Sequence, residues 1–333
     1  MSPEQELVSE VAAGIFLVRV PLPFALKIIN CYVIREAGRW ALVDCGYPTE
    51  EGVQAVRAGL RALGGSPRDL EAIFVTHHHP DHIGLAGLLQ EESGAPVLLH
   101  ALTRRIAETV MVTPDERWHR AYATMLRQHG VPEEEATWSV DEFINRRRII
   151  RPLLEARAVQ DGEVVELAGS TFRAVWTPGH ADGHLCLLRE SDGVLLSGDH
   201  LLPKITPNVS LFPEFRPDPL RDFLASLQKI AALPVTLGLP SHGRPFPQVH
   251  ERIAALQRHH DARLARILEA LNGQACTASE VSRRVFGELD SMDNRRFAVG
   301  EVLSHLEYLR AEGRVVRESS QGVYRYRAVA GGA

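Results

Sequence analysis

The chain has 333 residues, more than a usual single domain, so we expect one large domain and a smaller one. The formal net charge of -5 gives no global attraction to nucleic acid or anionic lipid, so a nucleic-acid function would need a local basic face. The four cysteines have no paired spacing, and the N-terminal residues resemble neither a signal peptide nor a membrane span. We therefore expect a cytoplasmic protein without a disulfide framework and without membrane contact.

Two runs of strand-like segments, each with helices, organise most of the chain. The first run predicts strands at 14–20, 28–35, 40–44, 72–75 and 96–100, with helices at 49–63 and 83–92. The second run predicts strands at 163–167, 171–177, 184–189, 194–197 and 235–240, with a helix at 219–233. This order is typical of an α/β (α+β) four-layer αββα sandwich, in which two sheets pack face to face with helices outside. We assign this sandwich domain to residues 1–246.

A charged, helix-prone insert at about 102–157 interrupts the two runs. It contains aromatic residues, including Trp118 and Phe143, and an arginine run at 146–148. Two interpretations stay open for this insert: a lid over a substrate cleft, or a helical hairpin whose aromatic residues pack on the sandwich.

The C-terminal part predicts a separate small domain. A linker helix at 247–273 ends at Gly273, a natural helix stop. Residues 274–333 then show helix, helix and hairpin, the order of a winged-helix domain. Nucleic-acid binding is one interpretation, and packing or dimerisation is the other. Residues 274–327 hold nine arginines against eight acidic residues, which favours the second interpretation because phosphate contacts need a positive face.

The most informative segment is 76–84, which reads Thr-His-His-His-Pro-Asp-His-Ile-Gly directly after an apolar strand. Three further candidate ligands follow in tight turns after strand-like segments. Imidazole nitrogens and carboxylate oxygens suit zinc and related divalent ions. A lone histidine is usually a surface or core residue, but seven such groups in these contexts predict a metal site. The candidates are His77, His79, Asp81, His82, His180, Asp199 and His242.

Spacing divides these groups between two ions. His77 and His79 alternate on an extended segment and so converge on one ion, while the pair Asp81-His82 turns toward a neighbouring ion. His180 would then complete the first site and His242 the second. Asp199 could bridge the two ions with its two carboxylate oxygens. We expect two divalent metal ions, with Zn²⁺ as the first choice and Fe or Mn as alternatives.

Two cations lower the pKa of a shared water, so a metal-bridging hydroxide is expected as the nucleophile of a hydrolase. Asp81 is the candidate catalytic residue that orients it. Asp44 and Thr76 either fix imidazole orientations or simply belong to a strand-terminal turn. Lys204 either binds an anionic substrate group or is a plain surface lysine. His78 and His200 neighbour the ligands but alternate away from them, so we leave them out.

Over about residues 10–250, the chain resembles the metallo-β-lactamase-fold hydrolases. Their THxHxDHxG pattern stands at 76–84, their TPGHxxGH pattern at 177–184 and their Gly-Asp pair at 198–199; Ser241 replaces a glycine in the final PGHG pattern. The resemblance implies a dinuclear centre like that of glyoxalase II-like members. The C-terminal part is similar to the associated domain in the branch that includes the lactamase-beta-like endoribonuclease.

Family resemblance does not select the substrate. We expect a small-molecule ester, lactone or thioester, because the chain is acidic and lacks a strong phosphate-binding run. The alternative is a metal-dependent endoribonuclease or other phosphodiesterase, with RNA as the partner. A DNA-binding regulator in which the metal only senses a ligand is the third hypothesis. A homodimer is compatible with all three.

Overall fold

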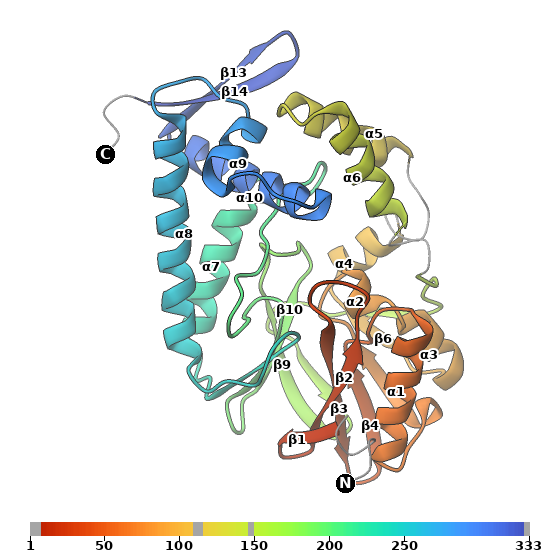
Figure 1. The fold of residues 1–333 in the computed structure, drawn as a ribbon. Helices are drawn as coiled ribbons and strands as arrows, with labels where there is room; N and C mark the ends of the chain where they lie inside the picture. The colour runs from red at the N-terminus through yellow and green to blue at the C-terminus, as the bar shows by residue number, and fades with distance from the viewer. Residues whose placement is uncertain (1–7, 109–115, 146–149, 330–333) are drawn as a thin grey trace.

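The computed structural model describes residues 8–108, 116–145 and 150–329, and Figure 1 shows its fold. One sheet has seven strands in chain order, and a second has five strands in the order β12-β11-β10-β9-β8. The first sheet contains β1 (Val8–Ala12), β2 (Ile15–Pro21), β3 (Ile28–Glu36), β4 (Arg39–Val43), β5 (Leu70–Phe74), β6 (Val97–Leu99) and β7 (Ala156–Ala158). The second contains β8 (Val164–Leu167), β9 (Ser170–Trp176), β10 (Leu185–Arg189), β11 (Val194–Gly198) and β12 (Leu237–Pro240).

The two sheets pack face to face through a continuous apolar core. Leu17 and Phe74 from the first sheet and Phe172 and Leu187 from the second belong to one buried cluster. Each such side chain stabilises the fold by about 1.5–3 kcal/mol on burial, so the sandwich does not depend on its polar edge for its folding free energy.

Helices cover both outer faces, which confirms the predicted four-layer sandwich (Figure 1). The helices α1 (Glu50–Ala62) and α3 (Ala86–Ser93) lie on the first sheet, and α7 (Pro219–Ala231) and α8 (Val249–Leu271) lie on the second. Thr49 caps α1 by accepting a hydrogen bond from the Gly52 N–H. A short 3₁₀ helix, η1 (Pro67–Asp69), precedes β5.

The helix predicted at 83–92 is wrong in its extent. The structure has two helices here, α2 (Pro80–Ile83) and α3, with a break at Gly84. Pro80 opens α2 because proline fits the first helical turn. A side chain at position 84 would collide with the Pro80 carbonyl and the Pro48 ring, so only glycine allows this approach.

The insert forms α4 (Ala101–Ile106), α5 (Glu116–Gln128) and α6 (Glu133–Asn145). Its aromatic residues point inward: the Trp118 and Phe143 rings stack at 4.5 Å and belong to the buried cluster that also holds α7, α8 and α10. At the end of α5, His129 donates from Nδ1 to the Tyr326 hydroxyl of the C-terminal part over 3.2 Å. The hairpin therefore packs on the C-terminal part of the chain.

That C-terminal part, which we call the C-terminal module, consists of α9 (Ala278–Phe286), α10 (Met292–Ala311), β13 (Val315–Ser320) and β14 (Val323–Ala328). The element order agrees with the prediction. However, α10, which would be the recognition helix of a winged-helix domain, packs against α6, α7, α8 and α9, and most of its side chains from Ala298 to Leu309 are buried. Its acidic residue Glu307 is buried and pairs with Arg310 and Arg317.

The four cysteines, Cys31, Cys45, Cys186 and Cys276, are all buried free thiols, in agreement with the expected lack of a disulfide framework. Among the described helices, none combines the length and the apolar character that a bilayer span requires.

Candidate metal centre

Turns at the carboxyl ends of strands deliver all seven predicted ligands to one edge of the sandwich. His77 and His79 follow β5, and the next pair of ligands lies on α2. His180 follows β9, Asp199 follows β11, and His242 follows β12. Since β4 and β5 are parallel in one sheet, and β11 and β12 in the other, their carboxyl ends open on the same edge.

The structure places the seven side chains in two groups whose potential ligand atoms lie within 4.8 Å of one another in each group. The first ligand group is His77, His79, His180 and Asp199, and the second ligand group is Asp81, His82 and His242. This division matches the one predicted from the spacing.

Asp199 lies between the two groups. Its Oδ2 is 3.3 Å from His180 Nε2 in the first group. Its Oδ1 is 3.6 Å from both His82 Nε2 and His242 Nε2 in the second group. The two oxygens of one carboxylate thus face different groups, as a bridging ligand requires.

Asp44 and Thr76 contact the imidazoles, as the first of their two interpretations predicts. His82 donates from Nδ1 to Asp44 Oδ2 over 2.7 Å. Thr76 donates its hydroxyl to Asp44, at 2.9 Å from Oδ2, and accepts from His77 Nδ1 over 3.0 Å. Asp44 adopts φ 58°, a left-handed conformation that aspartate tolerates better than most residues. These bonds leave Nε2 of His77 and His82 for a ligand.

Backbone carbonyls orient two other imidazoles, and the sequence did not indicate them. His180 donates from Nδ1 to the Asn208 carbonyl over 2.7 Å, and His242 donates from Nδ1 to the Ile28 carbonyl over 2.9 Å. The turn that carries His242 is fixed by Asn30, whose side-chain amide donates to the carbonyls of Pro240 and Gly243, each over 2.8 Å. Such carbonyl contacts leave no residue-type signal, because any residue supplies a carbonyl.

Two side chains that support Asp199 were also missed. His184 accepts a hydrogen bond from the Asp199 N–H over 3.1 Å and donates from Nδ1 to Thr177. Ser241 donates its hydroxyl to Asp199 Oδ1. The second histidine of the TPGHxxGH pattern was the available signal for His184. The departure from glycine at position 241 supplies a hydrogen-bond donor that glycine lacks.

The electrostatics of the cluster favour bound positive charge. Burial alone would raise the pKa of Asp199, but the imidazoles of His242 and His82 hold it well below its usual range. Burial alone would lower the pKa of His242, but the carboxylates of Asp199 and Asp81 raise it to about 9. Both carboxylates are therefore ionised at neutral pH.

The donor set fits metal ions. The Nε2 atoms of His82 and His242 are buried and have no hydrogen-bond partner, although both approach carboxylates. Buried polar atoms without partners are rare, and a cation between these nitrogens and oxygens would satisfy them. Imidazole nitrogens with carboxylate oxygens suit zinc, iron or manganese.

The two histidines that the prediction left out, and Lys204, are not part of the two ligand groups. His78 contacts the Phe215 ring at 6.0 Å, and His200 is buried beside the Phe223 ring. Lys204 is exposed, and its proposed contact with an anion stays a prediction. The arginine run at 146–148 lies outside the described residues.

Comparisons with known proteins agree with the fold. A family model for the metallo-beta-lactamase superfamily matches residues 26–242, and one for the metallo-beta-lactamase-like C-terminal domain matches residues 264–329. The crystal structure of a metallo-beta-lactamase family protein from Thermus thermophilus is 38% identical, with a TM-score of 0.85, and covers 96% of this chain and 100% of its own.

Two curated relatives match along most of the chain. A probable metallo-hydrolase, YqjP, from Bacillus subtilis is 28% identical over 90% of this chain and 92% of its own length. An atrochrysone carboxyl ACP thioesterase from Pseudocercospora fijiensis is 24% identical over 91% of this chain and 76% of its own length.

Proposed function

The chain belongs to the metallo-beta-lactamase superfamily and is a metallo-hydrolase, and on that premise we propose that it cleaves a small ester, lactone or thioester with two divalent ions, Zn²⁺ first among them. We also propose the domain division at 246 and 273, a glyoxalase II-like ligand set and a cytoplasmic location. The C-terminal module is proposed as a packing domain.

The observation that carries the dinuclear proposal is the position of Asp199. One carboxylate oxygen faces His180 and the other faces His82 and His242, at 3.3 to 3.6 Å. A mononuclear site would have no use for a carboxylate shared between two clusters of nitrogens. Two ions held here would lower the pKa of a water molecule and polarise the acyl carbonyl.

The protein residues then orient the reaction. Asp81 is held as a carboxylate, because the imidazoles of His82 and His242 outweigh the effect of burial and lower its pKa. Its Oδ2 lies 3.4 Å from His242 Nε2, within the second ligand group. We assign Asp81 the role of accepting a hydrogen bond from the attacking water and aligning it with the acyl carbon.

Two observations favour an acyl substrate over RNA. The Pseudocercospora relative is named a thioesterase and matches 91% of this chain. In the C-terminal module, α10 is enclosed by neighbouring helices, and its acidic residues Glu301 and Glu307 pair internally with arginines. A nuclease that used this module would need an open, positive face.

The test is a substrate screen on purified protein with measured metal content. We expect two metal ions per chain, turnover of at least one ester, lactone or thioester, and loss of that turnover after chelation with recovery on adding Zn²⁺. Cleavage of single-stranded RNA that weakens steeply with salt, without acyl hydrolysis, would support the alternative instead. Size-exclusion chromatography of the same sample tests the proposed homodimer.

A further inference from the structure

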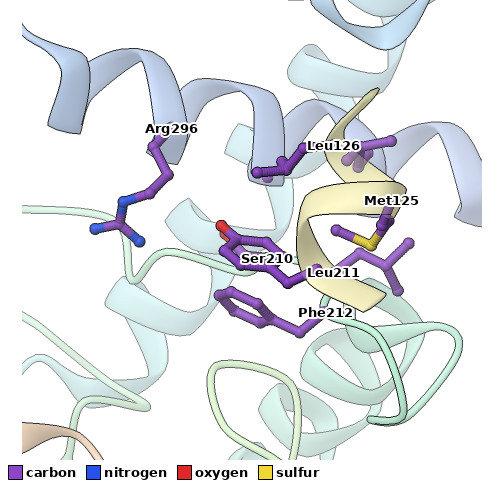
Figure 2. Close-up of a pocket in the computed structure, with 9 residues that line it drawn as sticks. Met125, Leu126, Ser210, Leu211, Phe212 and Arg296 are labelled. Atoms are coloured by element: carbon purple, nitrogen blue, oxygen red, sulfur yellow. The ribbon is translucent and has the colours of Figure 1, made fainter. Parts of the chain in front are cut away.

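A narrow cavity lies where the insert, the 205–217 segment and α10 meet (Figure 2). Its volume is about 10 Å³, close to the room that one water molecule needs. It therefore takes a small terminal group and not a whole acyl chain. Its walls include Met125 and Leu126 from α5, Ser210 and Phe212 from the 205–217 segment, and Arg296 from α10.

Arg296 is the charged residue of this cavity. Its side chain is only 10% exposed, and its Nε is buried without a hydrogen-bond partner. One terminal nitrogen contacts Asp293 Oδ1 at 3.2 Å, and the guanidinium carbon lies 4.3 Å from the centre of the Phe297 ring. A buried guanidinium with an unused donor is costly, so the site favours an added acceptor. In Figure 2, Arg296 descends from α10 on the side away from Met125 and Leu126.

The wall opposite α10 is connected to the metal cluster by hydrogen bonds. Ser210 donates its hydroxyl to Asn208 Oδ1 over 2.5 Å, and the Asn208 carbonyl accepts the hydrogen bond from the ligand His180 over 2.7 Å. Further along the same segment, the Phe215 ring lies 6.0 Å from the ring of His78. In the sequence, His78 stands between the candidate ligands His77 and His79. The wall of the cavity is therefore linked to the metal cluster through Ser210, Asn208 and His180.

The C-terminal module is fitted closely to this wall. On α10, Ser304 donates its hydroxyl to the Val209 carbonyl over 2.7 Å, and this contact is buried. A side chain at Gly300 would collide with the Ser210 hydroxyl, so glycine permits the close approach. Arg296 is thus held in position by α10, which also contacts this wall through Ser304 and Gly300.

We propose that Arg296 binds the carboxylate of an acidic acyl substrate whose scissile carbonyl lies at the metal cluster. The inference rests on the proposed acyl hydrolysis and specifies its substrate class. Arginine pairs well with planar carboxylates through charge-assisted hydrogen bonds, and a narrow cavity accepts a carboxylate oxygen more readily than a tetrahedral phosphate. Besides packing on the insert and the helices of the second sheet, the C-terminal module would then contribute to substrate selection.

The first experiment compares two matched esters, one whose acyl chain ends in a carboxylate and one whose acyl chain ends in a methyl ester. The wild type should prefer the anionic ester. Arg296→Gln should lower kcat/KM for it about tenfold or more, as expected for a lost hydrogen bond to a charged group. The neutral ester should be turned over as before, with unchanged metal content, and Arg296→Lys should recover part of the preference.

Arg295→Gln is the matched control, because it removes the same charge one residue away. Arg295 already has partners in Glu135 at 3.1 Å and the Leu289 carbonyl at 2.8 Å. We expect this variant to keep the preference for the anionic ester. An equal loss of preference in both variants, or none in Arg296→Gln, would overturn the proposal.

Calorimetric titration of the metal-loaded protein with glutarate, which cannot be hydrolysed, separates this proposal from the proposed function. Weaker glutarate binding in Arg296→Gln than in Arg295→Gln supports the carboxylate site even if no acyl substrate is turned over, in which case only the hydrolase proposal fails. Acyl turnover with equal glutarate binding in both variants, or with none in the wild type, overturns the carboxylate site and leaves the hydrolase proposal standing.

Discussion

The two ligand groups take their support from different parts of the molecule. In the second group, His82 and His242 donate to Asp44 and to the Ile28 carbonyl, at the end of β4 and the start of β3. In the first group, His180 donates to the Asn208 carbonyl, in a segment against which α10 packs. The second group is therefore fixed within the sandwich, whereas the first also depends on the C-terminal module.

The largest effect is expected for Asp199→Ala, which removes the residue common to both groups. We predict weakened binding of both ions and a loss of activity of roughly 10³-fold, since a bound metal contributes several kcal/mol to the barrier and about 1.4 kcal/mol is a factor of ten. Metal analysis after dialysis and kcat/KM on the best acyl substrate measure both effects. Thermal unfolding should still be cooperative, because the sheets rest on apolar burial. Retention of two tightly bound ions would contradict the bridging role.

A smaller and selective effect is expected for Ser304→Ala, which removes the hydrogen bond from α10 to the Val209 carbonyl. This variant acts on His180 through the backbone, so we predict a several-fold loss of affinity for one ion, below the roughly 10–100-fold of a direct outer-shell contact. Titration with a competing chelator should show one weakened and one unchanged site.

Asp44→Asn is the corresponding variant for the second ligand group, because it alters the direct hydrogen-bond partner of His82. Asparagine tolerates the left-handed backbone at this position, so the turn is kept. We expect Asp44→Asn to weaken binding of the ion of the second group more than that of the first, which Asp44 supports only through the Thr76 hydroxyl. Ser282→Ala, at a buried position on α9, controls for a general loss of packing. If Ser304→Ala and Ser282→Ala weakened the same site equally, the dependence on α10 would be disproved.

The same contrast explains what the sequence could predict. The clustering of the candidate ligands was predictable because each stands in a local pattern: a strand, a tight turn, then a residue type that can bind metal. Their supports were predictable only where a side chain adjoined a ligand or ended a strand, as for Thr76 and Asp44. Asn208 and Ser304 were not, because a backbone carbonyl and a buried serine acquire their roles only when distant segments meet.

The fold shows the same limit. The long strands and helices had clear periodicity, and the structure contains them with small shifts at their ends. The strands β1 and β7 were missed because they are short edge strands with few buried residues. The sequence also did not show which element the insert packs against. Its aromatic residues predicted packing, but not that α10 would be the neighbour.

The smallest expected effect is a loss of folding stability at acidic pH. We expect it in the C-terminal module before the sandwich. His305, on α10, donates from Nδ1 to the Glu301 carbonyl and accepts at Nε2 from His260 of α8 over 3.1 Å. Burial, together with Arg263 and His259, lowers the pKa of His305 to about 4, although the Glu301 carbonyl acts in the opposite direction. Burial, together with His305, His259 and Arg263, lowers the pKa of His260 to about 2. The pair is therefore neutral in the folded state.

The sign of the pH dependence follows from these pKa values. An unfolded histidine titrates near pH 6.5, so between about pH 6.5 and 4 the unfolded state binds protons that the folded pair refuses. The free energy of unfolding should fall as the pH is lowered through this window, by roughly 1–3 kcal/mol for His305. Denaturant titrations at pH 7 and pH 5 should show a smaller difference for His305→Gln than for the wild type. Hydrogen exchange, corrected for its intrinsic rate, should show the loss of protection in α10 before β3. If β3 opened first, the module would not be the acid-sensitive part, and the first ligand group would be as independent of it as the second.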